Sequence, residues 1–378
     1  MKDRQKKIDA LIEEGGRITA AQGLQLLRES NLLYLARLAQ RVRFRLNPLP
    51  RVTFVLDTNP NYTNICINEC SFCAFFRRTD APDAYTLSVD ELLQKFQSAA
   101  RKGVKTVLLQ GGVNTHLSLD YYLTLIRRTI NEVPEIHPHF FSPPEIMGIA
   151  RNAGLPPREI LKLFYEAGLR TMPGGGAEIL SERVKSKISP KKGSAEEWLY
   201  VMREAHRIGY KTTATMMYGH IEKDRDIIEH LERIRELQDE CGGFTAFIPW
   251  SFKPANSTLG RGRYKTPSPN RYLRIIALSR IYLDNFPHIQ ASWFSEGRKI
   301  GQIALYFGAD DFGGILLEEN VHAAANHVNA ITKEECIALI HQAGFAAAER
   351  DTFYNILKIY PLTARKNTEE GIDYPSSV

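Results

Sequence analysis

Short β-rich runs alternate with helix-like stretches through most of this 378-residue chain. Crossovers of this kind join parallel strands, so the alternation predicts parallel βα units with helices packed outside a sheet. Eight runs are found, at residues 52–56, 104–110, 137–141, 169–173, 211–217, 244–250, 289–293 and 305–312. With their crossovers they span about 260 residues, which is close to the size of an eight-stranded βα barrel.

We therefore expect an α/β fold with a (β/α)8 TIM-type barrel at residues 51–315. An N-terminal helical extension at residues 1–50 and a C-terminal α/β extension at residues 316–378 complete the expected domain organisation. The last two runs carry the weakest pattern, so a partial barrel of six strands is the alternative. In a TIM-type barrel the chemistry gathers at the C-terminal ends of the strands.

Composition narrows the range of partners. The chain is 43% hydrophobic and 24% charged, which is ordinary for a globular protein. Its net charge of +6 is spread over short, interrupted basic clusters, so we expect no nucleic-acid partner. No apolar run approaches the roughly 18 residues of a membrane helix, and no apolar segment follows the charged N-terminus. We expect a cytoplasmic protein with no membrane partner.

Three of the five cysteines crowd into one short segment, Cys66-Ile-Asn-Glu-Cys70-Ser-Phe-Cys73. In a reducing compartment such crowding indicates metal ligation rather than disulfides. Three thiolates can bind three irons of a [4Fe-4S] cluster and leave the fourth iron open to a substrate or cofactor. Structural zinc is the alternative, but it requires a fourth protein ligand, and this segment contains no further cysteine or histidine.

The spacing C-x3-C-x2-C after the first strand of a βα barrel resembles the radical S-adenosylmethionine (SAM) superfamily. The resemblance implies a radical SAM barrel in which the amino and carboxylate groups of S-adenosyl-L-methionine chelate the open iron. It also implies an oxidoreductase that cleaves SAM to methionine and a 5′-deoxyadenosyl radical, which abstracts a hydrogen atom from the substrate. Phe72 matches the family position that packs near the adenine, although it could equally anchor the loop in the core.

Two glycine turns are candidate cofactor-binding segments. Gln110-Gly111-Gly112 ends the second run, and the resemblance implies that its backbone approaches the methionine amino group, which only glycine allows. A second turn after the fourth run contains Gly174, Gly175 and Gly176. Three glycines before a helix could direct backbone N–H groups toward an anion or a ribose, and a tight βα turn is the alternative.

The candidate catalytic residues are Glu145, Glu178 and His220. Glu145 follows a Pro-Pro pair, and Glu178 lies at or near an expected helix N-terminus, where a carboxylate is electrostatically favoured. Either could bind sugar hydroxyls or act as a base; a surface position for Glu145 and helix capping for Glu178 are the alternatives. His220 follows the fifth run and is the first histidine candidate for acid–base work. His137 and His139 share a strand face and could line the site or belong to the core.

Further stretches resemble the cyclic dehypoxanthinyl futalosine synthases of menaquinone biosynthesis, and they lie between residues 50 and 325. Ser142-Pro-Pro-Glu-Ile146 and Phe247-Ile-Pro-Trp-Ser-Phe252 favour this family over aminofutalosine synthase. The implied substrate is dehypoxanthine futalosine, in which a short keto chain joins a ribose to a benzoate. The radical would take the ribose C4′ hydrogen, and the resulting carbon radical would close onto the benzoate ring.

The resemblance also implies a base for the ring proton and a group for the benzoate carboxylate, with Arg77 as one candidate. It implies a reducing electron donor such as flavodoxin or ferredoxin. Three alternatives remain at this point. The chain could be an aminofutalosine synthase, a synthase of the deazaflavin chromophore, or a non-catalytic zinc or iron-sulfur scaffold protein.

Overall fold

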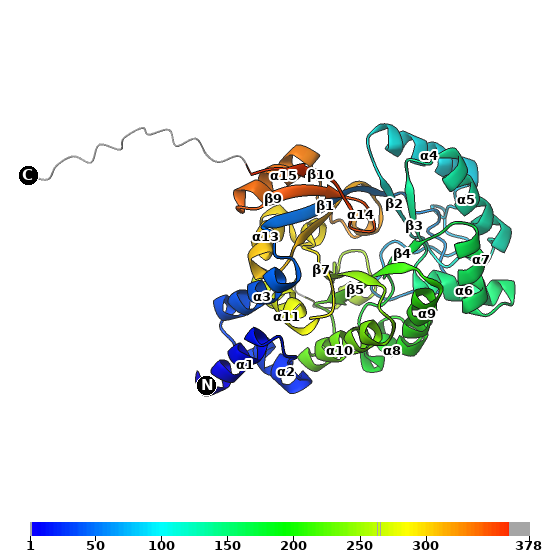
Figure 1. Cartoon of the computed structure of the whole chain (residues 1–378). Helices are drawn as coiled ribbons and strands as arrows, with labels where there is room; N and C mark the ends of the chain where they lie inside the picture. Colours follow the sequence, from blue (N-terminus) through cyan, green and yellow to red (C-terminus); the bar gives the residue numbers. More distant parts are fainter. Residues whose placement is uncertain (1, 263, 265, 363–378) are drawn as a thin grey trace, which may run out of the picture.

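A computed structural model describes residues 2–262, 264 and 266–362, and in it helices surround a ring of parallel strands (Figure 1). Strands β1 to β7 pair in sequence order, β8 pairs with β1, and a parallel bridge between Gln290 and Asp311 closes the ring. The predicted α/β barrel is therefore confirmed. The strands are β1 (Arg51–Asn59), β2 (Thr106–Leu109), β3 (His137–Phe140), β4 (Thr171–Met172), β5 (Lys211–Tyr218), β6 (Phe244–Ser251), β7 (His288–Ile289) and β8 (Asp311–Glu319).

Polar caps begin many of the outer helices. In α4, for example, the Ser88 side chain accepts from the backbone N–H of Glu91, and the Glu91 side chain accepts from the N–H of Ser88. This reciprocal capping box satisfies two N–H groups that the helix itself leaves unpaired.

The helices around the barrel are α4 (Val89–Arg101), α5 (Leu119–Glu132), α6 (Pro143–Ala153), α7 (Pro157–Glu166), α8 (Glu182–Ile188), α9 (Ala195–Ile208), α10 (Asp224–Cys241), α11 (Pro269–Tyr282), α12 (Trp293–Glu296) and α13 (Arg298–Ala304), with short 3-10 turns η1 (Leu259–Arg261) and η2 (Leu305–Phe307).

The structure differs from the sequence-based expectation at the eighth strand and after β3. The eighth strand begins at Asp311 rather than at residue 305, because residues 305–307 form the 3-10 turn η2 directly after α13. Helix α6 follows β3 at a place where the Pro-Pro pair does not suggest a helix. Pro143 and Pro144 occupy its first turn, where a proline removes no helical hydrogen bond.

The chain ends extend the barrel on two sides (Figure 1). The helices α1 (Lys2–Glu13), α2 (Ala20–Glu29) and α3 (Leu32–Leu46) confirm the helical character of the N-terminal segment, and α2 and α3 pack against α10 and α11. After β8 come α14 (Val321–Ala324), α15 (Lys333–Gln342), β9 (Ala346–Arg350) and β10 (Ile356–Tyr360). The part of the expected C-terminal extension beyond residue 362 lies outside the described residues.

The strand β9 runs parallel to β1 and is antiparallel to β10, so the C-terminal hairpin joins the barrel sheet. The loop between β9 and β10 reaches the barrel interior, where the hydroxyl groups of Thr352 and Thr106 lie 2.7 Å apart. Among the helices that the structure describes, none is long and apolar enough to cross a membrane.

Candidate active site

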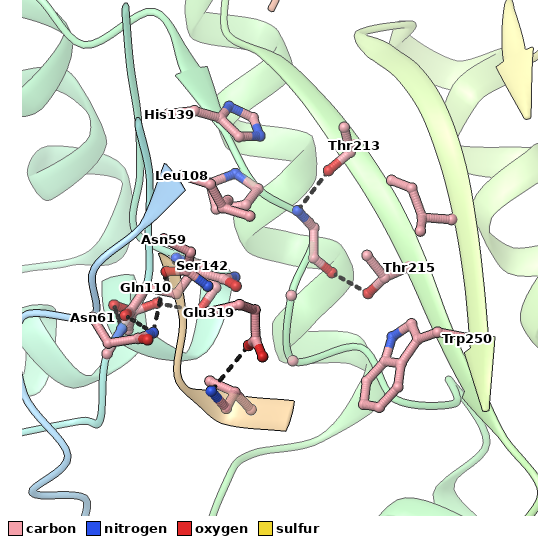
Figure 2. Close-up of a pocket in the computed structure, with 18 of the residues that line it drawn as sticks. Asn59, Asn61, Leu108, Gln110, His139, Ser142, Thr213, Thr215, Trp250 and Glu319 are labelled. Atoms are coloured by element: carbon pink, nitrogen blue, oxygen red, sulfur yellow. Dashed lines mark hydrogen bonds between the residues drawn. The ribbon is translucent and has the colours of Figure 1, made fainter. Parts of the chain in front are cut away.

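A cavity of about 350 Å³ lies inside the barrel. Inward-facing side chains of the strands line it, and Figure 2 shows several of them, among them Leu108, His139, Thr213, Thr215 and Trp250. The segments that follow the strands complete its wall, including the cysteine loop after β1 and both glycine turns. The cavity therefore opens where a TIM-type barrel carries its chemistry.

The cysteine loop is anchored on both sides by backbone hydrogen bonds. The N–H of Cys66 donates to the carbonyl of Arg77 at 3.0 Å, and the N–H of Ile67 donates to the carbonyl of Val113 at 3.1 Å. The Arg77 guanidinium donates to the carbonyls of residues 74, 75 and 76 and pairs with Asp83 at 2.7 Å. Arg77 thus holds the loop together and is not among the cavity-lining residues, which argues against it as a candidate ligand of the benzoate carboxylate.

Cys66, Cys70 and Cys73 all line the cavity. Burial raises the pKa of Cys70 to about 12 and raises that of Cys73 as well, so these thiols are protonated at neutral pH until a metal displaces the protons. Within the described residues, no group of three or more acidic, histidine or cysteine side chains is arranged to hold a single metal ion. A cubane distributes its thiolates over three irons, so this donor set fits a [4Fe-4S] cluster better than zinc.

The first glycine turn lets the cysteine loop approach β2. A Cβ at Gly112 would lie 2.1 Å from the backbone oxygen of Ile65, and a Cβ at Gly111 would lie 2.6 Å from the ring of Tyr62. The N–H of Gly112 donates to the carbonyl of Thr63 at 2.9 Å. Gln110, Gly111 and Gly112 all line the cavity, so this turn both positions the cysteine loop and faces the site.

The second glycine turn packs on β5. A Cβ at Gly174 would lie 2.1 Å from the backbone oxygen of Thr213. The N–H of Gly174 donates to the hydroxyl of Thr213 at 3.0 Å, and the hydroxyl of Thr215 donates to the Gly174 carbonyl at 2.8 Å (Figure 2). Gly174, Gly175 and Gly176 line the cavity, but the Gly174 N–H already has a partner. Helix α8 begins only at Glu182, so the turn does not lead directly into a helix.

Glu145 lines the cavity, yet both of its carboxylate oxygens are occupied. One oxygen accepts from the hydroxyl of Tyr62 at 2.8 Å and from the N–H of Gly111 at 3.0 Å. The other accepts from the N–H and the hydroxyl of Ser142. Burial raises the pKa of Glu145, and these hydrogen bonds oppose that rise. The residue is buried rather than on the surface, and it joins the β1 loop, the first glycine turn and the start of α6.

Glu178 lines the cavity in the loop before α8, with a φ of 46°, and not at a helix N-terminus as expected. Its carboxylate pairs with Lys192 at 2.5 Å. Burial alone raises the pKa of Glu178, but the charges of Lys192 and Lys185 outweigh this effect and hold the pKa below its usual value. Lys192 also lies 5.4 Å from the ring centroid of Phe72, which lines the cavity beside the cysteines.

The histidines take different places. His220 is not among the cavity-lining residues; its side chain is fully buried, with Nε2 3.0 Å from the carbonyl of Met217. His139 lines the cavity, and its Nδ1 lies 2.8 Å from the Thr171 hydroxyl, which His137 also contacts. Burial lowers the pKa of His139 to about 3. His139 is therefore neutral and can face a ligand, whereas His220 is kept from the cavity.

Several cavity-lining residues were missed by sequence reasoning. Asp57 and Asn59 occupy alternate inward positions of β1, and Lys192, Trp250 and Glu319 come from later segments. The period-two alternation of β1 is the one sequence pattern that could have identified Asp57 and Asn59. The approach of Lys192 to Glu178 depends on how two loops fold over the barrel, and no local pattern encodes it.

The chain matches two described families over most of its length. Residues 60–234 match the radical SAM superfamily, and residues 241–362 match the CofH/MqnC C-terminal region. A cyclic dehypoxanthine futalosine synthase of Halalkalibacterium halodurans is 37% identical, with 93% of this chain and 96% of the relative covered. A 5-amino-6-(D-ribitylamino)uracil--L-tyrosine 4-hydroxyphenyl transferase of Methanopyrus kandleri is 38% identical over 92% of this chain and 94% of the relative. An aminodeoxyfutalosine synthase of Thermus thermophilus is 39% identical over 92% of this chain and 95% of the relative.

Among solved structures, methylornithine synthase superposes with a TM-score of 0.67 at 18% identity, covering 89% of this chain and 96% of that chain. A likeness at this identity concerns the fold, and it agrees with the barrel described above. The relatives at 37% identity and above cover nearly the whole chain and establish the family. The chain therefore belongs to the radical SAM superfamily of enzymes, whose members use a [4Fe-4S] cluster and S-adenosylmethionine.

Proposed function

We propose that this protein is a radical SAM cyclase that converts dehypoxanthine futalosine to cyclic dehypoxanthinyl futalosine in menaquinone biosynthesis. In this proposal Cys66, Cys70 and Cys73 hold the cluster, and the two glycine turns receive SAM. When bound, the cluster and SAM supply the radical that removes the ribose C4′ hydrogen. A reduced flavodoxin or ferredoxin is the proposed electron donor.

The residues of this chain hold, orient and enclose the substrate. The barrel strands and the segments that follow them line the cavity, so a bound substrate would be largely withdrawn from water, which would otherwise compete for a reactive carbon radical. Glu145 holds the first glycine turn against the cysteine loop and acts as a positioning residue, because its oxygens already accept four hydrogen bonds. The ionised Glu178 and its partner Lys192 offer a charged pair beside Phe72 for polar groups of the cofactor.

The observation that carries the cyclase assignment is the place of two family-like stretches in the cavity. Ser142 and Glu145 belong to the first stretch and Trp250 belongs to the second, and all three line the cavity. These stretches resemble the cyclases more than aminofutalosine synthase. Because part of each stretch lies in the cavity wall, the resemblance bears on the substrate as well as on the fold.

A second candidate function comes from the relatives at similar identity. The Methanopyrus kandleri relative is named for joining a ribitylaminouracil to the 4-hydroxyphenyl group of tyrosine. This candidate shares the radical chemistry with the cyclase but uses two substrates, a sugar-alcohol-bearing heterocycle and a phenol. The aminodeoxyfutalosine synthase relative defines a third reaction on the same fold.

The test uses the reconstituted protein under anaerobic conditions with SAM and a reductant. Dehypoxanthine futalosine is supplied to one sample, and 5-amino-6-(D-ribitylamino)uracil with tyrosine is supplied to another. The cyclase proposal expects cyclic product in the first sample and 5′-deoxyadenosine in proportion to it. Formation of 5′-deoxyadenosine without cyclic product would reject the cyclase while retaining the superfamily, and product in the second sample alone would favour the transferase.

A further inference from the structure

Asp57 places an unsatisfied carboxyl oxygen inside the barrel. The residue lines the cavity one inward-facing position before Asn59 on β1, and it is 8% exposed. Its Oδ1 is buried and has no hydrogen-bond partner within the described residues. Buried polar groups in folded proteins almost always have a partner, so a buried carboxyl at a ligand cavity points to a partner on the ligand.

The strand β8 makes room for this carboxyl group. A Cβ at Gly314 would lie 2.2 Å from Asp57 Oδ2, and a Cβ at Gly313 would lie 2.4 Å from the amide nitrogen of Gln290. Two consecutive glycines therefore let a carboxyl group and an amide reach the same region from β1 and from the end of β7. Thr106, the register partner of Asp57 on β2, adds a hydroxyl, and all three side chains line the cavity.

The charges around Asp57 disfavour an anionic ligand group. Arg350, the cation whose charge acts on Asp57, donates to both carboxylate oxygens of Asp311, at 2.6 and 3.1 Å, so its charge is balanced by that carboxylate. Burial lowers the pKa of His139 to about 3 and raises the pKa of Tyr354 well above its usual value, so both side chains are uncharged. An ionised Asp57 then leaves this region negative, and a ligand carboxylate here would be uncompensated.

A neutral hydroxyl group of the ligand can bind beside Asp57 without adding a second negative charge. It donates to the Asp57 carboxylate and accepts from the Gln290 amide, or from the Thr106 hydroxyl when Thr352 is the donor in the hydrogen bond between the two threonines. Adjacent hydroxyls on one carbon chain can engage these side chains together. A carboxylate that receives ribose hydroxyls is also a recurrent arrangement in nucleotide-binding proteins.

We infer that Asp57, Gln290 and Thr106 form a binding site for the hydroxyl groups of a sugar or sugar alcohol. The inference rests on the proposed function in one respect, since the ribose of dehypoxanthine futalosine would supply those hydroxyls. The benzoate carboxylate then binds elsewhere in the cavity. The ribitylaminouracil of the second candidate function carries a sugar alcohol and would use the same site.

The first test measures binding without turnover. Dehypoxanthine futalosine is titrated by calorimetry into the anaerobic, cluster-loaded protein with no SAM or reductant present. We expect Asp57→Asn to weaken binding at least tenfold, because it loses a charge-assisted hydrogen bond, and Gln290→Leu to weaken it severalfold. Asp80→Asn removes the same charge from an exposed loop and should leave binding unchanged. Binding by Asp57→Asn within twofold of the wild type would overturn the inference.

The pH dependence of binding separates a hydroxyl from a carboxylate at this site. Burial raises the pKa of Asp57 to about 7, while the charge of Arg350 opposes the rise. The ionised form accepts the hydroxyl, so wild-type affinity should increase from pH 6 to pH 8, and Asp57→Asn should abolish this trend. Affinity that falls over the same range would mean that a ligand carboxylate takes up a proton with Asp57, and the inference would be rejected.

A second probe keeps this inference distinct from the cyclase assignment. The compound 5-amino-6-(D-ribitylamino)uracil carries a sugar alcohol but no carboxylate. If it binds in an Asp57-dependent manner while dehypoxanthine futalosine is not cyclised, the hydroxyl site stands and the cyclase assignment fails. If cyclisation proceeds and Asp57→Asn binds both compounds like the wild type, the cyclase assignment stands and the hydroxyl site fails.

Discussion

Cys70 is the most buried of the three clustered thiols, and its place among them predicts how its substitution affects the iron content. It lies beside Cys66 and Cys73 on the same cavity wall. In the proposed site each of the three thiolates binds one iron of the cubane, so the loss of one thiolate would leave two irons without a cysteine ligand. At the residue scale, the proposed function therefore predicts that the metal content depends on each of these three side chains.

We expect Cys70→Ala to abolish the cluster. Iron and sulfide per chain after anaerobic reconstitution should fall to background, and the visible absorption of the cluster should disappear. Cys241→Ala is the matched control, because Cys241 lies near the surface at the end of α10 and contacts His206. Wild-type iron content in Cys70→Ala would contradict the assignment of this residue as a ligand.

The raised pKa of Asp57 also predicts how the stability of the ligand-free protein depends on pH. Because burial raises its pKa to about 7, the folded protein binds an extra proton between the usual aspartate range and pH 7. The unfolded chain has already released that proton, so this residue lowers the stability of the ligand-free protein as the pH rises through that window. The destabilisation comes from an ionised carboxyl group whose Oδ1 lacks a partner in the part of the chain that the structure describes.

Asp57→Asn should therefore stabilise the ligand-free protein at pH 8 by about 1–3 kcal/mol, the usual cost of an unsatisfied buried group. At pH 5 the folded wild type still holds its proton while its unfolded chain has already released it, so the substitution should stabilise the protein less at pH 5 than at pH 8. Thermal unfolding of both proteins at the two pH values measures the difference. A gain of equal size at pH 5 and pH 8 would show that the ionised carboxyl is not its source.

At the scale of single elements, the turn after β2 is where the barrel meets the cysteine loop. Its glycines are required by contact and not by backbone conformation, since a Cβ at Gly112 would collide with the backbone oxygen of Ile65. Backbone cannot yield as a flexible side chain does, so the loop itself would have to move. The geometry of the three thiols depends on this approach.

We expect Gly112→Ala to destabilise the protein by roughly 3 kcal/mol, in the range of strongly overpacked core substitutions, and to lower its iron content. Gly154→Ala is the control: this glycine caps α6 with a φ of 65°, and an added Cβ meets nothing within 4 Å. That control should lose only about 1 kcal/mol for its backbone strain and should keep its iron. Thermal unfolding and iron analysis on the same samples test both effects, and equal iron content in the two variants would argue against a positioning role for the turn.

At the scale of the whole molecule, the C-terminal hairpin closes the barrel interior. Arg350 at the end of β9 pairs with Asp311 at the start of β8, and both side chains are buried. The loop after β9 contributes Thr352 and Tyr354 to the cavity wall. A segment about 300 residues from β1 in the sequence therefore determines one end of the site.

Replacing Arg350 by methionine should cost about 3–5 kcal/mol, because it leaves the buried Asp311 carboxylate without a counter-charge. The double variant Arg350→Met with Asp311→Asn should recover part of that loss. Lys95→Met breaks the partly exposed pair with Glu318 and should change stability by less than about 1 kcal/mol. Urea unfolding of the four proteins measures these differences, and a loss in Arg350→Met as small as in Lys95→Met would refute the closing role of the ion pair.

The sequence by itself determined the barrel, and it singled out the segment that we propose as the cluster-binding one. Strand and helix periodicity is local, so all eight predicted runs overlap strands, and α6 was missed because Pro143 and Pro144 suggest a break. The C-x3-C-x2-C spacing is likewise contained within a few residues. Periodicity and cysteine spacing can be inferred from a single sequence because each depends only on residues that are close together along the chain.

Only the tertiary structure decided which polar groups remain available for chemistry. In the tertiary structure both oxygens of Glu145 accept hydrogen bonds, the Arg77 side chain binds its own loop, and His220 lies outside the cavity wall. Asp57 Oδ1 has no hydrogen-bond partner among the described residues. The reason is physical: the hydrogen-bonding state and the charge of each group depend on partners that lie on distant strands and loops. Those partners come together only when the barrel closes.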